Sequence, residues 1–113
     1  RAIVSILAWC VPILPGKKEK WQGMMDQMNQ QPMKKEADEV RENAGVHERT
    51  FLQETPDGDL LIITYEGDDP VASFAKIMES LPADFGDFVK DIHGIDVAEP
   101  PPPLPRLVYD SRA

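Results

Sequence analysis

The sequence has very little cysteine: Cys10 is the only one in 113 residues. A disulfide within the chain is therefore excluded, and so is any site built on a Cys-x-x-Cys pair. This pattern is typical of proteins kept in a reducing compartment, so we expect a cytoplasmic protein. Cys10 stands among apolar neighbours, where a cysteine packs as a small hydrophobe more often than it acts as a nucleophile.

Basic residues are also scarce. Twelve Lys and Arg stand against twenty Asp and Glu, which gives a formal net charge of −8 at pH 7. Phosphate contacts need clustered Lys and Arg, so we expect no nucleic-acid partner. Solubility explains the acidic balance more simply than an acidic docking surface does.

Long apolar runs are missing apart from the first fifteen residues, RAIVSILAWCVPILP. This run is too short to span a bilayer, and Pro12 and Pro15 interrupt it. It also lacks a convincing small-residue cleavage site of the kind that follows a signal peptide. We interpret it as a strand over 3–11 that is covered on both faces, and we expect no membrane partner.

The remaining pattern predicts one domain over 1–113 with alternating strands and helices. Two runs of strand character, 47–54 and 60–65, flank the turn Thr55-Pro56-Asp57-Gly58-Asp59. Apolar residues recur at helical spacing in four other stretches, at 21–28, 33–44, 71–78 and 85–92. Pro32 separates the first two stretches, and Gly45 and Gly94 are typical helix stops.

The Asp57-Gly58 dipeptide predicts a hairpin with a symmetric loop centred on it. That register sets Thr55 opposite Leu60 and Arg49 opposite Glu66. It also divides the side chains between two faces, because strands alternate with a period of two. The more apolar face, predicted to pack under helices, holds Leu52, Leu61, Ile63 and Tyr65. The mixed face holds Phe51, Leu60 and Ile62 together with Gln53, Thr64 and an Arg49–Glu66 pair.

The element order β-α-β-β-α-(α)-β predicts an α+β fold, the ferredoxin-like split β-α-β-β-α-β sandwich with an antiparallel four-stranded sheet. The proline-rich segment 99–105 is expected to be an extended polyproline II strut that delivers a short final strand at 107–109 to a sheet edge, either the chain's own or that of a partner copy. Helices on one face would leave the other face of the sheet open. We therefore expect a homodimer joined through the face that bears Phe51, Gln53, Leu60 and Ile62.

Several segments resemble a family of small uncharacterised bacterial proteins: ILAWCVPILPGK, FLQETPDGD, YEGDDP and IHGID followed by prolines. That family is similar to members of the dimeric α/β-barrel superfamily, and the resemblance covers most of residues 5–110. It implies a ferredoxin-like protomer whose sheet pairs with a second sheet around a cavity. The wider superfamily includes cofactor-independent monooxygenases, isomerases, mutarotases, haem-degrading enzymes and ligand-sensing domains. The resemblance brings no assigned reaction and therefore no catalytic residues.

The two histidines and one arginine are the candidates for chemistry. His47 and His93 show no metal-binding spacing, and the DGD and GDD clusters lack a calcium-loop series, so neither a metal nor a cofactor is expected. His93 is expected at a helix C-terminus, where an imidazolium suits the helix dipole. Either histidine could serve as an acid or a base, and Arg49 is a candidate for stabilising developing charge.

Four residues are expected to line a ligand pocket on the sheet: Trp9, Phe51, Gln53 and Thr64, with His47 or His93 at its mouth. A cross-strand pair with dimer hydrogen bonds explains the same polar groups equally well. The four methionines at 24, 25, 28 and 33 are expected in the core, although a thioether wall could also shape a cavity.

Two functions therefore remain open. In the first, the homodimer binds a small apolar or aromatic molecule and carries out a cofactor-independent oxidation or isomerisation. In the second, it is a non-catalytic interaction module whose polar sheet face specifies the dimer. An apolar cavity with convergent polar groups would favour the first, and a tightly filled sheet interface would favour the second.

Overall fold

A computed structural model describes residues 5–100 and 103–113. Three strands and four helices occur in these residues, in the order β1, α1, α2, β2, β3, α3, α4. Their bounds are β1 Ser5–Ile13, α1 Lys18–Met28, α2 Met33–Ala44, β2 Val46–Thr55, β3 Gly58–Gly67, α3 Pro70–Glu79 and α4 Ala83–His93. The predicted α+β class is confirmed at this level.

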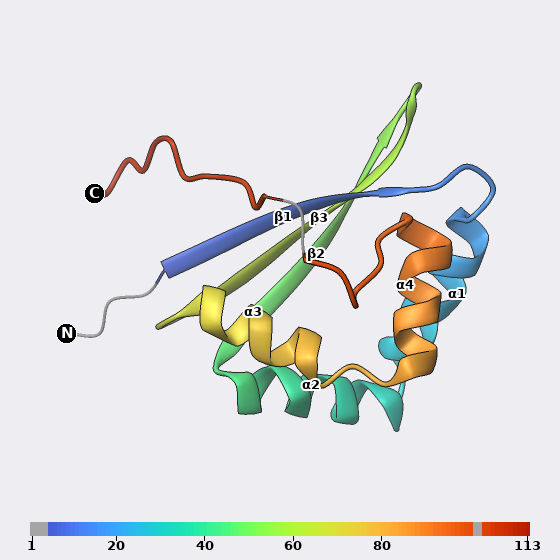
Figure 1. Ribbon diagram of the computed structural model, residues 1–113, viewed down its shortest axis with the longest axis horizontal. Helices are drawn as coiled ribbons and strands as arrows, with labels where there is room; N and C mark the ends of the chain where they lie inside the picture. The colour runs from blue at the N-terminus through green and yellow to red at the C-terminus, as the bar shows by residue number, and fades with distance from the viewer. Residues whose placement is uncertain (1–4, 101–102) are drawn as a thin grey trace.

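The three strands form one antiparallel sheet in the order β1-β3-β2. Strand β3 pairs with both neighbours, so β1 and β2 run parallel and are joined by a crossover through α1 and α2. The helices lie on one side of the sheet (Figure 1). The predicted fourth strand at 107–109 is an irregular, exposed segment in this structure. The polyproline prediction falls partly outside the described residues, since 101 and 102 are not among them.

Three of the helix boundaries lie at capping residues that can be recognised in the sequence. Asp69 accepts a hydrogen bond from the Ala72 amide at 3.2 Å, and Pro70 occupies the first helical position of α3. Gly45 and Gly94 end α2 and α4 with φ of 84° and 70°, the left-handed conformation that glycine adopts without a Cβ penalty. No helix in the described part of the chain combines the length and the apolar run needed to cross a membrane.

The predicted hairpin register is wrong by two residues. Thr55 pairs with Gly58, so the loop is Pro56-Asp57 instead of Asp57-Gly58. Proline has a fixed φ that suits the second position of a tight turn, which places Gly58 at the fourth position. A shift of two residues keeps each side chain on its predicted face, because alternation has the same period. The face assignment therefore survives, although the individual pairs change.

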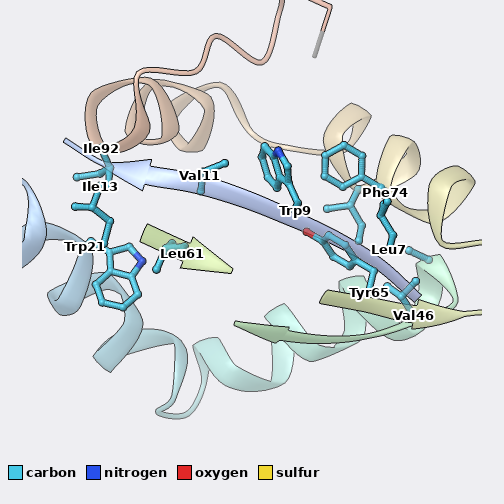
Figure 2. Packing of buried hydrophobic residues seen from close by; sticks show 12 residues of the cluster. Leu7, Trp9, Val11, Ile13, Trp21, Val46, Leu61, Tyr65, Phe74 and Ile92 are labelled. Atoms are coloured by element: carbon cyan, nitrogen blue, oxygen red, sulfur yellow. The ribbon is translucent and has the colours of Figure 1, made fainter. Parts of the chain in front are cut away.

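The core lies between the sheet and the helices. Leu61 and Tyr65 are each 3% exposed, as expected for the apolar face. Phe74 of α3 packs edge-on against both Trp9 and Tyr65, with ring centroids 5.0 and 5.6 Å apart (Figure 2). The buried side of α3 is formed by Pro70, Ser73, Phe74 and Ile77. Val71, the first apolar residue of the predicted helical repeat at 71–78, is 59% exposed and does not belong to this buried side.

The opposite face of the sheet is open. Ile6 on β1 is 59% exposed and Phe51 on β2 is 52% exposed. Cys10 is exposed on the same face, so it does not pack as a buried hydrophobe in this structure. The expectation that β1 is covered on both faces is therefore wrong for the single chain. One face of the sheet is a core wall, and the other is an uncovered surface with an apolar centre.

Candidate functional site

The four residues predicted to line a pocket do not come together. Phe51, Gln53 and Thr64 lie on the open face, where Gln53 donates to the Glu54 carbonyl oxygen at 3.4 Å. Trp9 pairs with Ile63 and so faces the helices on the other side of the sheet, where it is 8% exposed. The sheet itself separates Trp9 from the other three residues. Their joint role in one pocket is therefore not supported by the geometry.

A cavity of about 90 Å³ lies instead on the helix side, within the core, and we call it the inner cavity. The sheet forms its floor, and α1, α3 and α4 form its walls. Its walls include the methionines at 24, 25 and 28, in the arrangement we left open as a thioether wall. Met33 is 39% exposed, so its predicted place in the core is wrong. The lining contains further apolar side chains: Trp9, Val11, Leu61, Ile63, Ile77, Met78, Leu81, Phe85 and Val89. Most of the surface that a bound molecule would meet is apolar.

Trp21 brings the most informative polar atom to this cavity. Its side chain is 5% exposed and lines the cavity from α1. Its Nε1–H is buried and has no hydrogen-bond partner among the described residues. Figure 2 shows the indole nitrogen turned inward, on the side of Leu61. A buried donor left without an acceptor costs about 1–3 kcal/mol, so an acceptor placed in the cavity would be bound favourably.

A polar cluster forms the wall next to α2 and β2. Arg41 donates from Nε to Glu48 at 2.9 Å and from Nη1 to the Ala37 carbonyl at 3.2 Å. Glu48 also accepts from the Thr50 hydroxyl at 3.2 Å. Its cross-strand neighbour is Tyr65. Burial, followed by the nearby Glu48 carboxylate, raises the pKa of Tyr65, so its phenol stays protonated at neutral pH.

An open groove of about 460 Å³ lies outside this cluster, between α1, α2 and β2, and we call it the outer groove. Arg41, Glu48 and Thr50 line both the outer groove and the inner cavity, together with Met25 and Met28. The two spaces therefore share a wall made of a salt bridge and two flexible thioethers. A molecule in the outer groove is therefore separated from the inner cavity by this wall alone.

The two histidines line different spaces. His47 is exposed and lines the outer groove, whereas His93 is half-buried and lines the inner cavity. His93 Nδ1 lies 2.7 Å from the Pro12 carbonyl oxygen. A carbonyl only accepts, so Nδ1 carries the proton and Nε2 keeps its lone pair. His93 ends α4 as expected, and its burial lowers its pKa by more than the backbone hydrogen bond raises it, so burial acts against the imidazolium that the helix C-terminus would favour.

Arg49, the predicted charge stabiliser, lies on the open face and not at the cavity. Its Nη1 is 3.6 Å from the Glu66 carboxylate, which confirms the predicted ion pair. The pair is diagonal, because Arg49 stands opposite Thr64 in the observed register. Arg41 is the arginine that reaches the inner cavity, and sequence reasoning missed it.

The signal that points to Arg41 was present in the strand pattern. Glu48 falls at a position of β2 that faces the helices, on the same side as Leu52. A carboxylate on the core side of a strand requires a charged or hydrogen-bonding partner. The helix that precedes the strand offers Arg41 in its last turn. No comparable signal identifies Trp21, since an aromatic residue on a helical stripe is ordinary core.

The arrangement can bind an uncharged molecule and orient it by a few hydrogen bonds. Trp21 offers a donor, and His93 offers an acceptor at Nε2 in its neutral form. A neutral imidazole that lines the same cavity as an unpartnered N–H donor is also suited to moving a proton on a carbonyl compound. No group of three His, Cys, Asp or Glu in the described residues is arranged to hold a metal ion.

Comparison of the chain with protein-family models, with curated proteins and with solved structures finds no significant match. The geometry of the inner cavity and the outer groove therefore provides the evidence on function.

Proposed function

We propose that the protein binds a small, uncharged, mostly apolar molecule that carries a hydrogen-bond acceptor, and that the molecule occupies the inner cavity. The acceptor meets the indole N–H of Trp21, and the apolar body lies against the methionines and aliphatic side chains. The observation that supports this most strongly is the buried Trp21 donor without a partner. Native proteins leave few such groups unsatisfied, and those that remain require an explanation.

The size and charge of the two spaces narrow the ligand class. A cavity of about 90 Å³ suits a single small ring or a short chain. Drug-sized ligands occupy about 300–1,000 Å³, so a larger molecule would have to extend past Arg41 into the outer groove. The protein carries a net charge of −8, and Glu48 lies at the cavity wall, so an anion is disfavoured.

The superfamily resemblance fits this proposal. The strand order β1-β3-β2 with a parallel crossover between β1 and β2 is the order of the first three strands in a ferredoxin-like sheet. Within that framework, a cofactor-independent isomerisation is the reaction class we propose if the protein is catalytic. For a β,γ-unsaturated carbonyl compound, His93 Nε2 would remove a proton from the carbon between the carbonyl and the double bond, and the resulting imidazolium would return that proton to the γ carbon. The double bond moves into conjugation with the carbonyl, while Trp21 donates to the carbonyl oxygen.

Native mass spectrometry of gently purified protein tests the proposal. Wild-type protein should retain a small uncharged molecule, and Trp21→Phe should lose it, because phenylalanine keeps the apolar ring and removes the donor. Gln53→Leu is the matched control on the open face and should retain the molecule. A ligand that persists in Trp21→Phe and is lost in Gln53→Leu would move the site to the open face and refute the proposal. So would wild-type protein that carries no ligand.

The second candidate function, an interaction module, is supported by a different observation. Phe51 and Ile6 are more than half exposed on the open face of the sheet, which has no helix over it. Exposed apolar surface of this kind marks contact sites between proteins. We propose a homodimer as the assembly, with a second copy over this face. A monomer in sedimentation velocity at micromolar concentration would refute it.

A further inference from the structure

Strand β1 is at the edge of the sheet, and only part of that edge is occupied. Its Pro12 carbonyl turns away from β3 and accepts the Nδ1–H of His93 at 2.7 Å. Just beyond, the Leu14 amide donates to the Ile92 carbonyl at 2.8 Å. Helix α4 and its end therefore cover the edge near the last residues of β1.

The rest of this edge has no partner. In an antiparallel strand, alternate residues direct both their N–H and their C=O groups to the same side. Ile6, Ala8 and Cys10 share the parity of Pro12, so their backbone groups point to the free edge. No hydrogen bond joins these groups to another described residue. An exposed edge of this kind is a template for pairing with another strand.

The same chain carries a segment that is suited to fill this edge. Residues 105–111 lie beside Ser5, Ile6 and Ala8, across a gap of about 820 Å³ (Figure 1). Within it, Leu107, Val108 and Tyr109 are 73%, 80% and 80% exposed. Valine and tyrosine are among the residues most enriched in strands, and none of the three contributes to the core here. A strand-forming segment and a free strand edge therefore lie side by side without pairing.

We infer that two copies of the chain exchange these segments: residues 106–110 of each copy pair with residues 6–10 of β1 in the other. We favour a second copy over the chain's own segment because two incomplete surfaces lie next to each other, the unpaired edge of β1 and the uncovered open face of the sheet. The free edge needs a strand, and the neighbouring open face needs cover for Ile6 and Phe51. The chain's own segment leaves Phe51 52% exposed. A second copy related by a two-fold axis supplies the strand and the cover together.

This pairing uses backbone groups at the edge of the sheet, whereas the inner cavity is lined by side chains on its helix side, so the pairing does not depend on a ligand there. The inference rests on the homodimer proposed above and adds one statement to it: the fourth strand of each sheet comes from the partner copy. A sheet completed in this way has four strands, with the exchanged segment next to β1.

Sedimentation velocity on two variants at Ala8 tests the pairing. Ala8→Pro removes an N–H that points away from β3, so the sheet ladder within the chain stays intact. Ala8→Thr changes the side chain and keeps the N–H. We expect dimers for wild type and Ala8→Thr, and monomers for Ala8→Pro with unchanged far-ultraviolet circular dichroism. A dimer that survives Ala8→Pro but not Phe51→Ser would show a contact through the face alone and overturn the inference.

Cross-linking between different chains decides the matter even if Ala8→Pro fails to fold. Wild-type chains, which keep Cys10, are mixed with chains that carry Cys10→Ser and Val108→Cys, and a short bismaleimide is added. We expect a cross-linked heterodimer that links Cys10 to the new thiol at 108, identified by peptide mass. A variant with Val108→Cys alone holds both thiols in one chain. Cross-links confined to single chains in that variant, with no heterodimer in the mixture, would show that each chain uses its own segment and would overturn the inference.

Discussion

The salt bridge between Arg41 and Glu48 should be one of the strongest single polar contacts in the protein. The two side chains are 21% and 16% exposed, with Nε 2.9 Å from the carboxylate. An exposed pair contributes about 0–1 kcal/mol, and removing one partner from a fully buried pair costs about 3–5 kcal/mol. For burial between these limits, and after discounting for solvent screening, we expect a coupling of about 1.5–2 kcal/mol.

A double-mutant cycle measures this coupling. Arg41→Met and Glu48→Gln are made singly and together, and the free energy of unfolding is obtained from urea titrations. The pair of Arg49 and Glu66 on the open face is the matched control, with 3.6 Å between the charged atoms and side chains 45% and 34% exposed. That cycle should give less than about 0.5 kcal/mol. Equal couplings in the two cycles would refute the view that Arg41 and Glu48 form a partly buried wall of the cavity.

Two further predictions concern pH and backbone packing. Burial holds the pKa of His93 below its ordinary 6.5, so the unfolded chain binds the proton more tightly, and stability is lost as pH falls below about 6.5. His93→Asn keeps a donor and should lose less stability than wild type between about pH 7 and pH 5. Equal loss of stability in the two proteins would contradict this. A Cβ on Gly67 would lie 2.3 Å from the Gly45 carbonyl oxygen, so Gly67→Ala should cost about 2–3 kcal/mol. A Cβ on Gly23, inside α1, meets no atom within 4 Å, so Gly23→Ala should be stabilising. If the two substitutions changed the free energy of unfolding in the same direction, the packing argument would be contradicted.

The helices could be predicted from the sequence because their signals are local. Asp69 and Pro70 at the start of α3, and Gly45 and Gly94 after α2 and α4, act within one turn of the chain. The sequence also predicted which side chains of the hairpin face the helices. Side chains alternate between the two faces of a strand, so Leu61 and Tyr65 fall on the same face. In each case the deciding interaction lies within a few residues.

The features that sequence reasoning missed depend on distant parts of the chain. The hairpin loop was misplaced because Pro56 competes with the Asp57-Gly58 signal for the centre of the turn. Trp9 was assigned to the wrong side because its facing depends on pairing with β3, more than fifty residues away. The partnerless donor of Trp21 emerges only when α1, α4 and the sheet close around it. A cavity has no local sequence pattern of its own.

The central claim is that the Trp21 indole donates to a ligand acceptor in the inner cavity, and nuclear magnetic resonance tests it most directly. The chain has two tryptophans, so its nitrogen–proton spectrum contains two indole signals, and Trp21→Phe assigns them. Cyclopentanone, which carries an acceptor, is compared with cyclopentane, which has the same ring without one. We predict a saturable downfield shift of the Trp21 indole proton with cyclopentanone and none with cyclopentane. An unchanged Trp21 signal with cyclopentanone, or the same shift with both probes, would contradict the account.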